Sequence, residues 1–170
     1  MNFLDLVKDR YSCKKFSDKK VDREILSRVL EAGRLAPTAK NLQEQKIYVA
    51  ESDEALSKID GVTPCRYGAP TVLVVAFDKE NTFTYPGGKY DSGKEDAAIV
   101  ATHMILGAAS EGLDSCWVNA FDPDKLASAL ELPANEEILC LIDLGFKAEG
   151  AGPLDNHFDR KDLDETVSFI

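Results

Sequence analysis

The sequence predicts one α+β domain over residues 1–170, with a small mixed or antiparallel sheet surrounded by helices. The chain has 170 residues, which is close to the usual size of a single domain. Helical patterns stand at both ends, and short strand patterns lie between them without a regular alternation of strand and helix. One long helix is apolar around nearly its whole circumference, so it must be covered on all sides.

The first two helices are predicted near the N-terminus. The first covers residues 3–8. The second begins after Asp22, which can cap the free backbone amides, while Val21 and Leu26 occupy the two positions of a hydrophobic staple. Pro37 ends this second helix.

The long apolar helix is predicted over residues 95–111 and ends at Gly112, and a shorter helix follows at 123–130. Two arrangements would cover the long helix. It can lie at the centre of the domain, or a second copy of the chain can cover its outer face. Its alanines permit close helix approach, so we favour the homodimer, with this helix at the interface.

Four segments are predicted as strands, at residues 46–50, 71–77, 115–120 and 138–145. The second is a continuous apolar and β-branched run, which indicates a strand covered on both faces. Two stretches, 78–94 and 148–159, have no periodicity and are expected to be loops.

Composition excludes several classes of protein. Lys and Arg total 20 against 30 Asp and Glu, and a net charge of −10 argues against nucleic-acid and anionic-membrane binding. No uninterrupted run of 18 apolar residues is present, and the N-terminus lacks the pattern of a secretory leader. The four cysteines and two histidines have no metal-ligand spacing, so we expect no metal, free thiols and a cytoplasmic location.

The sequence lacks the glycine-rich fingerprints of Rossmann and P-loop nucleotide sites and the serine elbow of α/β-hydrolases. Near the N-terminus, Arg10, Ser12 and Lys14 alternate and would share one face of an extended segment, with Tyr11 between them. Two cations and a hydroxyl suit a phosphate. On spacing alone, a solvated basic edge is the simpler interpretation.

Three further segments carry polar groups at helix or strand ends. Residues 36–43 form a helix end followed by small and amide side chains, and residues 112–121 form a turn into a strand with Trp117. Residues 158–161 contain Arg160 and Lys161 near the C-terminus. Taken singly, each is consistent with an ordinary loop, a packed strand or a solvated tail.

In order along the chain, the four segments resemble the nitroreductase family of flavin mononucleotide (FMN) enzymes. The family's R-x-S-x-[RK]-x-F opening stands here at residues 10–16, and A-P-[ST]-x-x-N-x-Q stands at 36–43. G-L-G-S-x-W is matched by residues 112–117, and R-K-x-L-x-E by 160–165. The resemblance spans almost the whole chain and implies the nitroreductase-like fold and a homodimer with two flavins at its interface.

The resemblance assigns a role to each matching position. Arg10, Ser12 and Arg160 would hold the phosphate, with Lys161 as a weaker candidate and Tyr11 as a neighbour. Lys14 would reach the pyrimidine edge of the flavin ring. The remaining expected contacts are Pro37, Thr38 and Asn41 from the other subunit, and the backbone of Asn119 and Ala120 at flavin N5.

The chain departs from the family pattern at Asp114, at Ala120 and at residues 44–45. These departures concern the shape of the substrate site more than flavin binding. The 78–94 stretch is expected to cover the pocket and to decide the choice of substrate. Residues 66–67, before the second strand, are interpreted as loop structure rather than as flavin contacts.

The function that the resemblance implies is a ping-pong oxidoreductase without a catalytic side-chain nucleophile. NAD(P)H, or a reduced electron-carrier protein, would reduce the flavin at N5, and a nitroaromatic, quinone or similar flat acceptor would then take the electrons. Two alternatives remain. One is a non-enzymatic flavin-binding redox sensor or flavin reservoir, and the other is a structural dimer without a cofactor.

Overall fold

The computed structural model describes residues 2–170 and contains one four-stranded sheet with strand order β1-β2-β4-β3. The strands are β1 (Gln45–Ala50), β2 (Thr71–Asp78), β3 (Asp114–Val118) and β4 (Glu136–Gly145). All neighbouring strands are antiparallel. The predicted small sheet is therefore confirmed, and its antiparallel form is the correct one.

The helices are α1 (Phe3–Asp9), α2 (Arg23–Arg34), α3 (Asp53–Asp60), α4 (Gly93–Ser110), α5 (Pro123–Ala129) and α6 (Leu163–Thr166). Asp22 accepts a hydrogen bond from the Glu24 amide at 2.8 Å and caps α2 as predicted. The sequence analysis missed α3, although Ser52 caps it in the usual way. It also extended β3 too far, since the strand ends at Val118.

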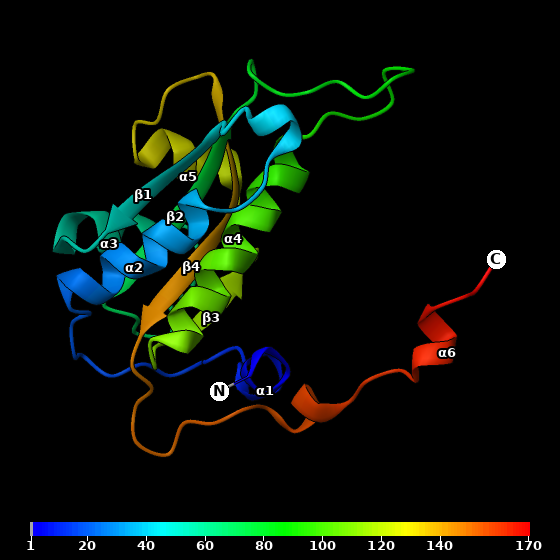
Figure 1. The fold of residues 1–170 in the computed structure, drawn as a ribbon. Coiled ribbons are helices and arrows are strands. Elements are labelled where there is room, and N and C mark those ends of the chain that lie inside the picture. Colours follow the sequence, from blue (N-terminus) through cyan, green and yellow to red (C-terminus); the bar gives the residue numbers. More distant parts are fainter. Residues whose placement is uncertain (1) are drawn as a thin grey trace.

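The domain has three layers (Figure 1). Helices α2 and α4 cover one face of the sheet, where Leu73, Val75 and Ile142 join their core. On the other face, Val72 and Val74 belong to a second core with residues of α3, α5 and the N-terminal segment. Strand β2 is buried over seven of its eight residues, which confirms the prediction that it is covered on both faces.

Helix α4 packs closely against α2. A Cβ on Gly33 would lie 2.6 Å from Met104 Cγ, and one on Gly107 would lie 2.9 Å from Ala32 Cβ, so both glycines permit the close approach. Gly112 follows α4 with φ of 74° and supplies the predicted helix end. The outward side of α4 remains uncovered within the chain, with Ile99 half-buried and Thr102 and His103 exposed.

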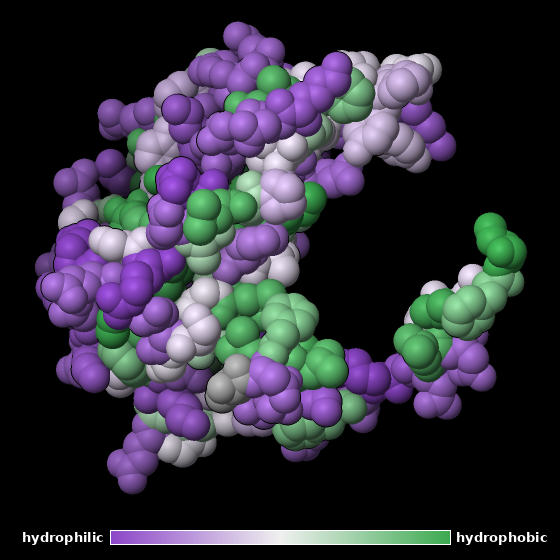
Figure 2. All heavy atoms as spheres, viewed as in Figure 1, coloured by the Kyte–Doolittle hydropathy of each residue, from purple (hydrophilic) through white to green (hydrophobic). Residues whose placement is uncertain are grey.

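Two segments project from the layers on the same side of α4 (Figure 1). One is the region around Thr84 and Asp91, which the sequence analysis expected to be a plain loop and which forms a short hairpin with an antiparallel bridge. The other is the C-terminal tail. Figure 2 shows a hollow between them, and the tail's apolar side chains gather at its end and along the side that borders the hollow. Within residues 2–170, no helix combines the length and apolarity needed to cross a bilayer.

Strand β4 buries an acid, Asp143, at 0% exposure. Among the described residues, neither of its carboxylate oxygens has a hydrogen-bond partner. Burial raises the pKa of Asp143 to about 8, against the opposing effect of the Arg66 cation. The native protein therefore keeps a proton that the unfolded chain releases above about pH 4.

We predict that Asp143 makes the apoprotein less stable as the pH rises from about 4 to 8, because the native state binds the extra proton. Asp143→Asn removes this titration. Between pH 4 and pH 8.5, the free energy of unfolding of the variant should gain about 5 kcal/mol relative to wild type. Chemical denaturation at fixed protein concentration measures the difference, and parallel pH profiles for the two proteins would contradict it.

Candidate functional site

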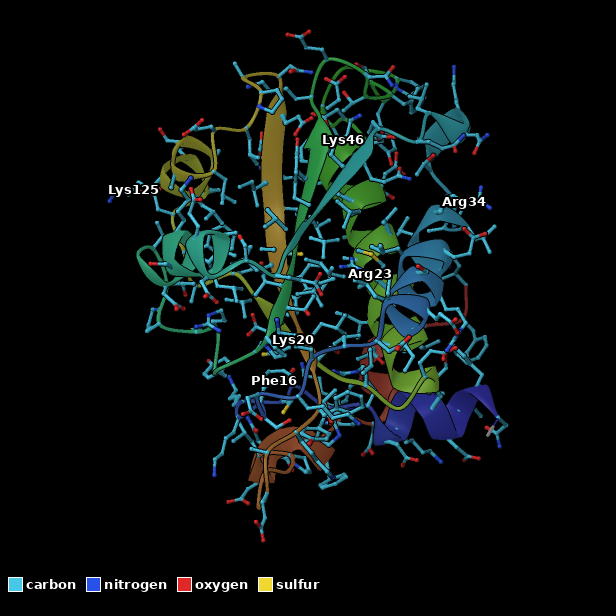
Figure 3. All side chains as sticks on the ribbon, turned by 90° about the vertical axis from the view of Figure 1, so that its left-hand side faces the viewer. Phe16, Lys20, Arg23, Arg34, Lys46 and Lys125 are labelled. Carbon is cyan, nitrogen blue, oxygen red and sulfur yellow. The ribbon has the colours of Figure 1, made fainter. Side chains whose placement is uncertain are left out.

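The N-terminal segment after α1 is fastened along the free edge of β3. The Cys13 amide donates to the Ser115 carbonyl at 2.9 Å, and Ser12 forms a parallel bridge with Ser115. Phe16 is buried and anchors the segment, and its amide donates to the Tyr67 carbonyl at 3.0 Å (Figure 3). This pairing places the side chains of residues 12 and 14 beside the sheet.

Ser12 and Lys14 line one pocket of about 210 Å³ together with Cys116 and Trp117. The C-terminal tail closes one side of this pocket with Leu154, Asn156 and His157. His157 also packs edge-on against Tyr11, with ring centroids 6.2 Å apart. Chain segments from both ends of the sequence therefore meet at this pocket.

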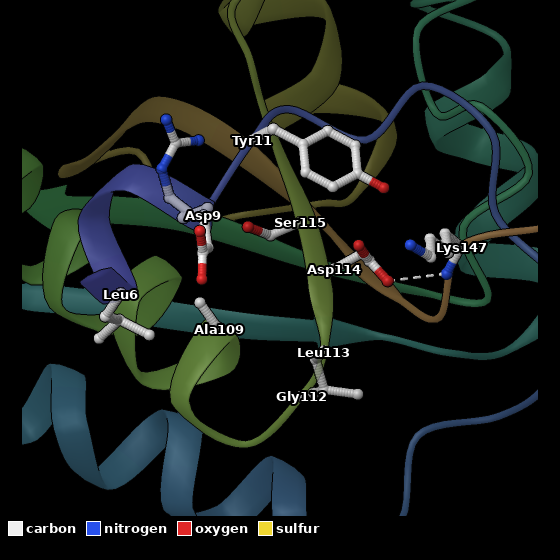
Figure 4. Close-up of a pocket in the computed structure, with 10 residues that line it drawn as sticks. Leu6, Asp9, Tyr11, Ala109, Gly112, Leu113, Asp114, Ser115 and Lys147 are labelled. Carbon is white, nitrogen blue, oxygen red and sulfur yellow. Dashed lines mark hydrogen bonds between the residues drawn. The ribbon is translucent and has the colours of Figure 1, made fainter. Parts of the chain in front are cut away.

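Arg10 lines the neighbouring pocket of about 240 Å³ (Figure 4). Tyr11 lines both pockets, so the two pockets adjoin. The sequence predicted that Arg10, Ser12 and Lys14 share one face, but Arg10 lies in a different pocket from Ser12 and Lys14. Lys147 adds a second cation to the Arg10 pocket, and Asp9 and Asp114 add carboxylates.

Asp114 has a structural role in this pocket. Its carboxylate accepts a hydrogen bond from the Lys147 amide at 2.9 Å, which ties the start of β3 to the segment after β4. Burial and the nearby Asp114 charge raise the pKa of Tyr11, so the phenol stays protonated. Among residues 2–170, the buried Tyr11 hydroxyl has no hydrogen-bond partner and is available to a ligand oxygen.

Lys14 has Tyr67 as its partner, a residue that the sequence predicted only as part of a loop. Its ammonium donates to the Tyr67 hydroxyl at 3.3 Å and lies 5.0 Å from the centre of the Tyr67 ring. This hydrogen bond raises the pKa of Lys14, so the side chain stays a cation. The two residues are 53 positions apart, and no local sequence pattern indicates their contact.

Asn119 and Ala120 lie just beyond β3 and are exposed. The Trp117 indole donates to the Asn119 side chain at 2.8 Å. The Ala120 carbonyl accepts from the buried Thr63 hydroxyl, also at 2.8 Å. This segment is therefore exposed to a ligand and held in one conformation.

Arg160 and Lys161 follow the 3₁₀ turn at Asp155–Phe158. The Arg160 guanidinium donates to the backbone carbonyls of His157 and Asp159, and both tail cations are exposed. Neither lines the pocket of Ser12 or that of Arg10. The tail lines the pocket of Ser12 through Leu154, Asn156 and His157. Within one chain, however, Arg160 and Lys161 do not share a pocket with Arg10 or Ser12, the other expected phosphate contacts.

Pro37, Thr38 and Asn41 lie in a loop beside the start of α4. Lys40, Asn41 and Gln43 have positive φ values of 51°, 56° and 54°. Such a backbone is unfavourable for side-chain-bearing residues and needs compensating contacts.

The buried carboxylate of Asp96 supplies one such contact, since both of its oxygens accept from the Ala39 amide at 3.0 Å. Glu44, also buried, adds another by accepting from the Ser92 hydroxyl at 3.2 Å. Burial, together with the neighbouring Asp96 carboxylate, raises the pKa of Glu44.

The two groups of expected site residues lie at opposite ends of α4. The loop at 37–43 is hydrogen-bonded to Asp96 in the first turn of α4. Ala109, near the C-terminus of α4, lines the Arg10 pocket. The 18 residues of this helix span about 27 Å at 1.5 Å per residue. One chain therefore brings Ser12 and Lys14 to one end and does not bring Pro37, Thr38 and Asn41 to them.

The residues present fit one half of a flavin nucleotide site. An ammonium, a serine hydroxyl and an unpartnered phenol are the donors that a phosphate and a ring carbonyl need. Neither pocket alone reaches the roughly 300 Å³ at which ligand pockets begin. In the described part of the chain, burial raises the pKa of Cys116 to about 11, so this thiol is no ready nucleophile.

Comparison with known proteins identifies the family of the chain. The profile of the Nitroreductase family matches residues 7–63 and 64–146. A provisionally named NADH dehydrogenase/NAD(P)H nitroreductase of Methanothermobacter thermautotrophicus is 27% identical over 164 residues, which are 91% of this chain and 82% of that protein.

Solved structures agree as well. A nitroreductase family protein from Clostridium difficile 630 is 35% identical, with a TM-score of 0.93 over 99% of this chain and 98% of that one. An FMN-dependent nitroreductase from C. difficile R20291 is 27% identical, with a TM-score of 0.77 over 98% of each chain. The profile match covers most of the sequence, and the chain belongs to the nitroreductase family.

Proposed function

We propose that this protein is an FMN-dependent oxidoreductase that passes electrons from NAD(P)H, or from a reduced carrier protein, to a small flat acceptor by a ping-pong mechanism. The observation that carries the proposal is the cation of Lys14, held by Tyr67 at a pocket that Ser12 and Trp117 also line. Membership of the family and an FMN-dependent relative support the choice of cofactor.

Each residue has a defined task in this proposal. Ser12 and Arg10 bind the phosphate from two adjoining pockets, and Tyr11 between them can donate its unpartnered hydroxyl. Arg160 and Lys161 join them by a movement of the tail. Charge-assisted bonds from guanidinium groups are the strongest available for a phosphate.

FMN, when bound, would supply the redox chemistry between the nicotinamide and the acceptor. Lys14 would hold its cation at the pyrimidine edge and stabilise negative charge there. The backbone at Asn119 and Ala120 orients the ring. No side-chain nucleophile is required for this chemistry.

The proposed site is completed by a second copy of the chain, so the protein acts as a homodimer. The separation along α4 supports this, because Pro37, Thr38 and Asn41 then come from the partner. The uncovered side of α4 also offers a surface, where Ile99 and His103 line a shallow depression of about 370 Å³.

The C-terminal tail supports the same assembly. Its large apolar side chains lie in solvent within a single chain, with Leu163 at 76% and Phe169 at 99% exposure. Exposed apolar groups concentrated on one segment are typical of an interaction surface. The exposed apolar residues of the tail are Leu154, Phe158, Leu163, Val167, Phe169 and Ile170. We propose that this tail packs on the second copy.

The hairpin at residues 83–92 is proposed to face the acceptor. The Phe83 amide donates to Ser92 Oγ at 3.1 Å, and the Lys40 ammonium lies 4.7 Å from the Phe83 ring centre. The hairpin is therefore fastened to the loop that carries Pro37 and Asn41, and in the dimer it would lie near the partner's flavin. Its aromatic residues suit flat acceptors such as nitroaromatics and quinones.

Free cysteines fit a reducing cytoplasm.

The function is tested by absorbance spectroscopy of the purified protein. We expect a yellow protein, or one that becomes yellow with added FMN, and bleaching by NADH, NADPH or a reduced carrier protein without oxygen. Steady-state kinetics should give parallel double-reciprocal lines. FMN binding without reduction by any of these donors would favour a flavin reservoir or sensor instead, and no binding at all would overturn the proposal.

Removing phosphate contacts should weaken FMN binding. Ser12→Ala and Arg160→Ala should each raise the dissociation constant about 5- to 100-fold, because each deletes a hydrogen bond to a charged group. Fluorescence titration of the apoprotein measures this. Lys125→Ala is the matched control, since Lys125 projects from α5 far from the N-terminal segment (Figure 3). Unchanged FMN affinity in both test variants would show that Ser12 and Arg160 do not bind the phosphate.

Charges on the tail should separate the dimer. Leu163→Glu combined with Phe169→Glu leaves Arg160 in place but makes burial of the tail against a second copy unfavourable. We expect a shift from dimer to monomer in sedimentation equilibrium and at least tenfold weaker FMN binding. The control is Lys125→Glu. A tail variant that remains as dimeric as wild type would refute the role of the tail.

A further inference from the structure

The loop between α3 and β2, residues 61–70, is held rigidly in an unusual conformation. Tyr67 has a φ of 52° and Gly68 a φ of 79°. The Arg66 guanidinium fixes this loop by donating to both Asp60 oxygens, at 2.7 and 2.6 Å, and to the Ala69 carbonyl at 2.7 Å. A tyrosine in the left-handed region is unfavourable and persists only where its surroundings hold it there.

This loop contacts both segments that face the proposed flavin. At one side, Tyr67 accepts from the Phe16 amide through its carbonyl and from Lys14 through its hydroxyl. At the other side, Thr63 is 2% exposed and donates to the Ala120 carbonyl, while its oxygen accepts from the Cys65 amide at 3.1 Å. One loop therefore holds both Lys14 and the backbone at Ala120.

We propose that Tyr67 is a positioning residue that holds the Lys14 cation at the pyrimidine edge of the flavin and thereby raises the potential of the bound cofactor. This inference rests on the proposed function. A lysine side chain is flexible, and Lys14 is exposed, so a second group must restrict it if its charge is to act at one place. The Tyr67 hydroxyl and ring face together supply that restriction.

The chemistry of the partner is the reason why tyrosine suits this task. Among the described residues, Lys14 forms no ion pair, and its hydrogen-bond partner is a neutral hydroxyl. A carboxylate at the same place would also hold the ammonium but would cancel its field at the flavin. Tyr67 fixes the position of the charge and leaves the charge itself available.

The test is a double-mutant cycle on the FMN-loaded protein, with Tyr67→Phe, Lys14→Met and the combined variant. Tyr67→Phe keeps the ring and deletes the hydroxyl. It should weaken binding of reduced FMN relative to oxidised FMN about three- to tenfold. A tenfold change lowers the two-electron midpoint potential by about 30 mV. In the Lys14→Met background, Tyr67→Phe should change the potential no further, because it acts through Lys14.

Two further variants keep the test decisive. Tyr67→Asn tolerates the left-handed backbone and removes the ring as well, so it should lower the potential at least as much as Tyr67→Phe. Tyr48→Phe deletes the hydroxyl of a tyrosine on β1, the edge strand opposite β3, where it is bonded to Glu136, and it should leave the potential unchanged. Thermal unfolding of the apoproteins checks that each variant folds.

Several results would overturn the inference. If Tyr67→Phe weakens oxidised and reduced FMN equally, the potential stays constant and Tyr67 merely supports the fold. Fully additive effects in the double variant would show that Tyr67 does not act through Lys14. If Lys14→Met lowers the potential and both Tyr67 variants do not, this inference alone fails. A wild-type protein that takes up no FMN would defeat both this inference and the proposed function.

Discussion

The length of α4 is the constraint on which the arrangement of the site depends. Its 18 residues separate the loop at 37–43 from the pocket of Ser12 and Lys14 by more than the length of any side chain. Each end carries part of the proposed ligand site, and neither part is enclosed. In the proposed homodimer, a second copy of the chain with α4 against α4 would bring unlike ends together. The exposed stripe of this helix and the apolar tail would then be parts of one interface.

Of the five non-glycine residues with positive φ in the described chain, four lie at these same two ends. At one end, left-handed residues at 40, 41 and 43 are held by the carboxylate of Asp96. At the other, the left-handed Tyr67 is held by Arg66 and by the N-terminal segment. Such backbones need rigid surroundings, and rigid surroundings are what a site requires to fix a ligand's orientation. The regular strands between them carry no such strain and supply the core.

An acidic protein can still offer a cationic site, because local geometry outweighs net charge at short range. The chain carries a net charge of −10. Yet Arg10, Ser12 and Lys14 lie beside β3, and Lys14 is paired with a neutral tyrosine rather than with an acid. The remaining acids lie mainly on the solvent-exposed surface, where water and salt screen them. The overall charge therefore argues against extended polyanions as ligands and is compatible with one phosphate.

The sequence by itself determined the elements whose signals are local. The buried strand at 71–77, the cap at Asp22 and the helix end at Gly112 follow from hydrophobic pattern and backbone preference over a few residues, and four ordered motifs indicated the family. Only the tertiary structure decided which segments meet. It set Tyr67 beside Lys14, Thr63 beside Ala120 and Asp96 beneath Ala39, and it placed Arg10 in a pocket next to that of Ser12. These contacts join residues more than 50 positions apart, and they depend on how whole layers pack, which no local pattern encodes.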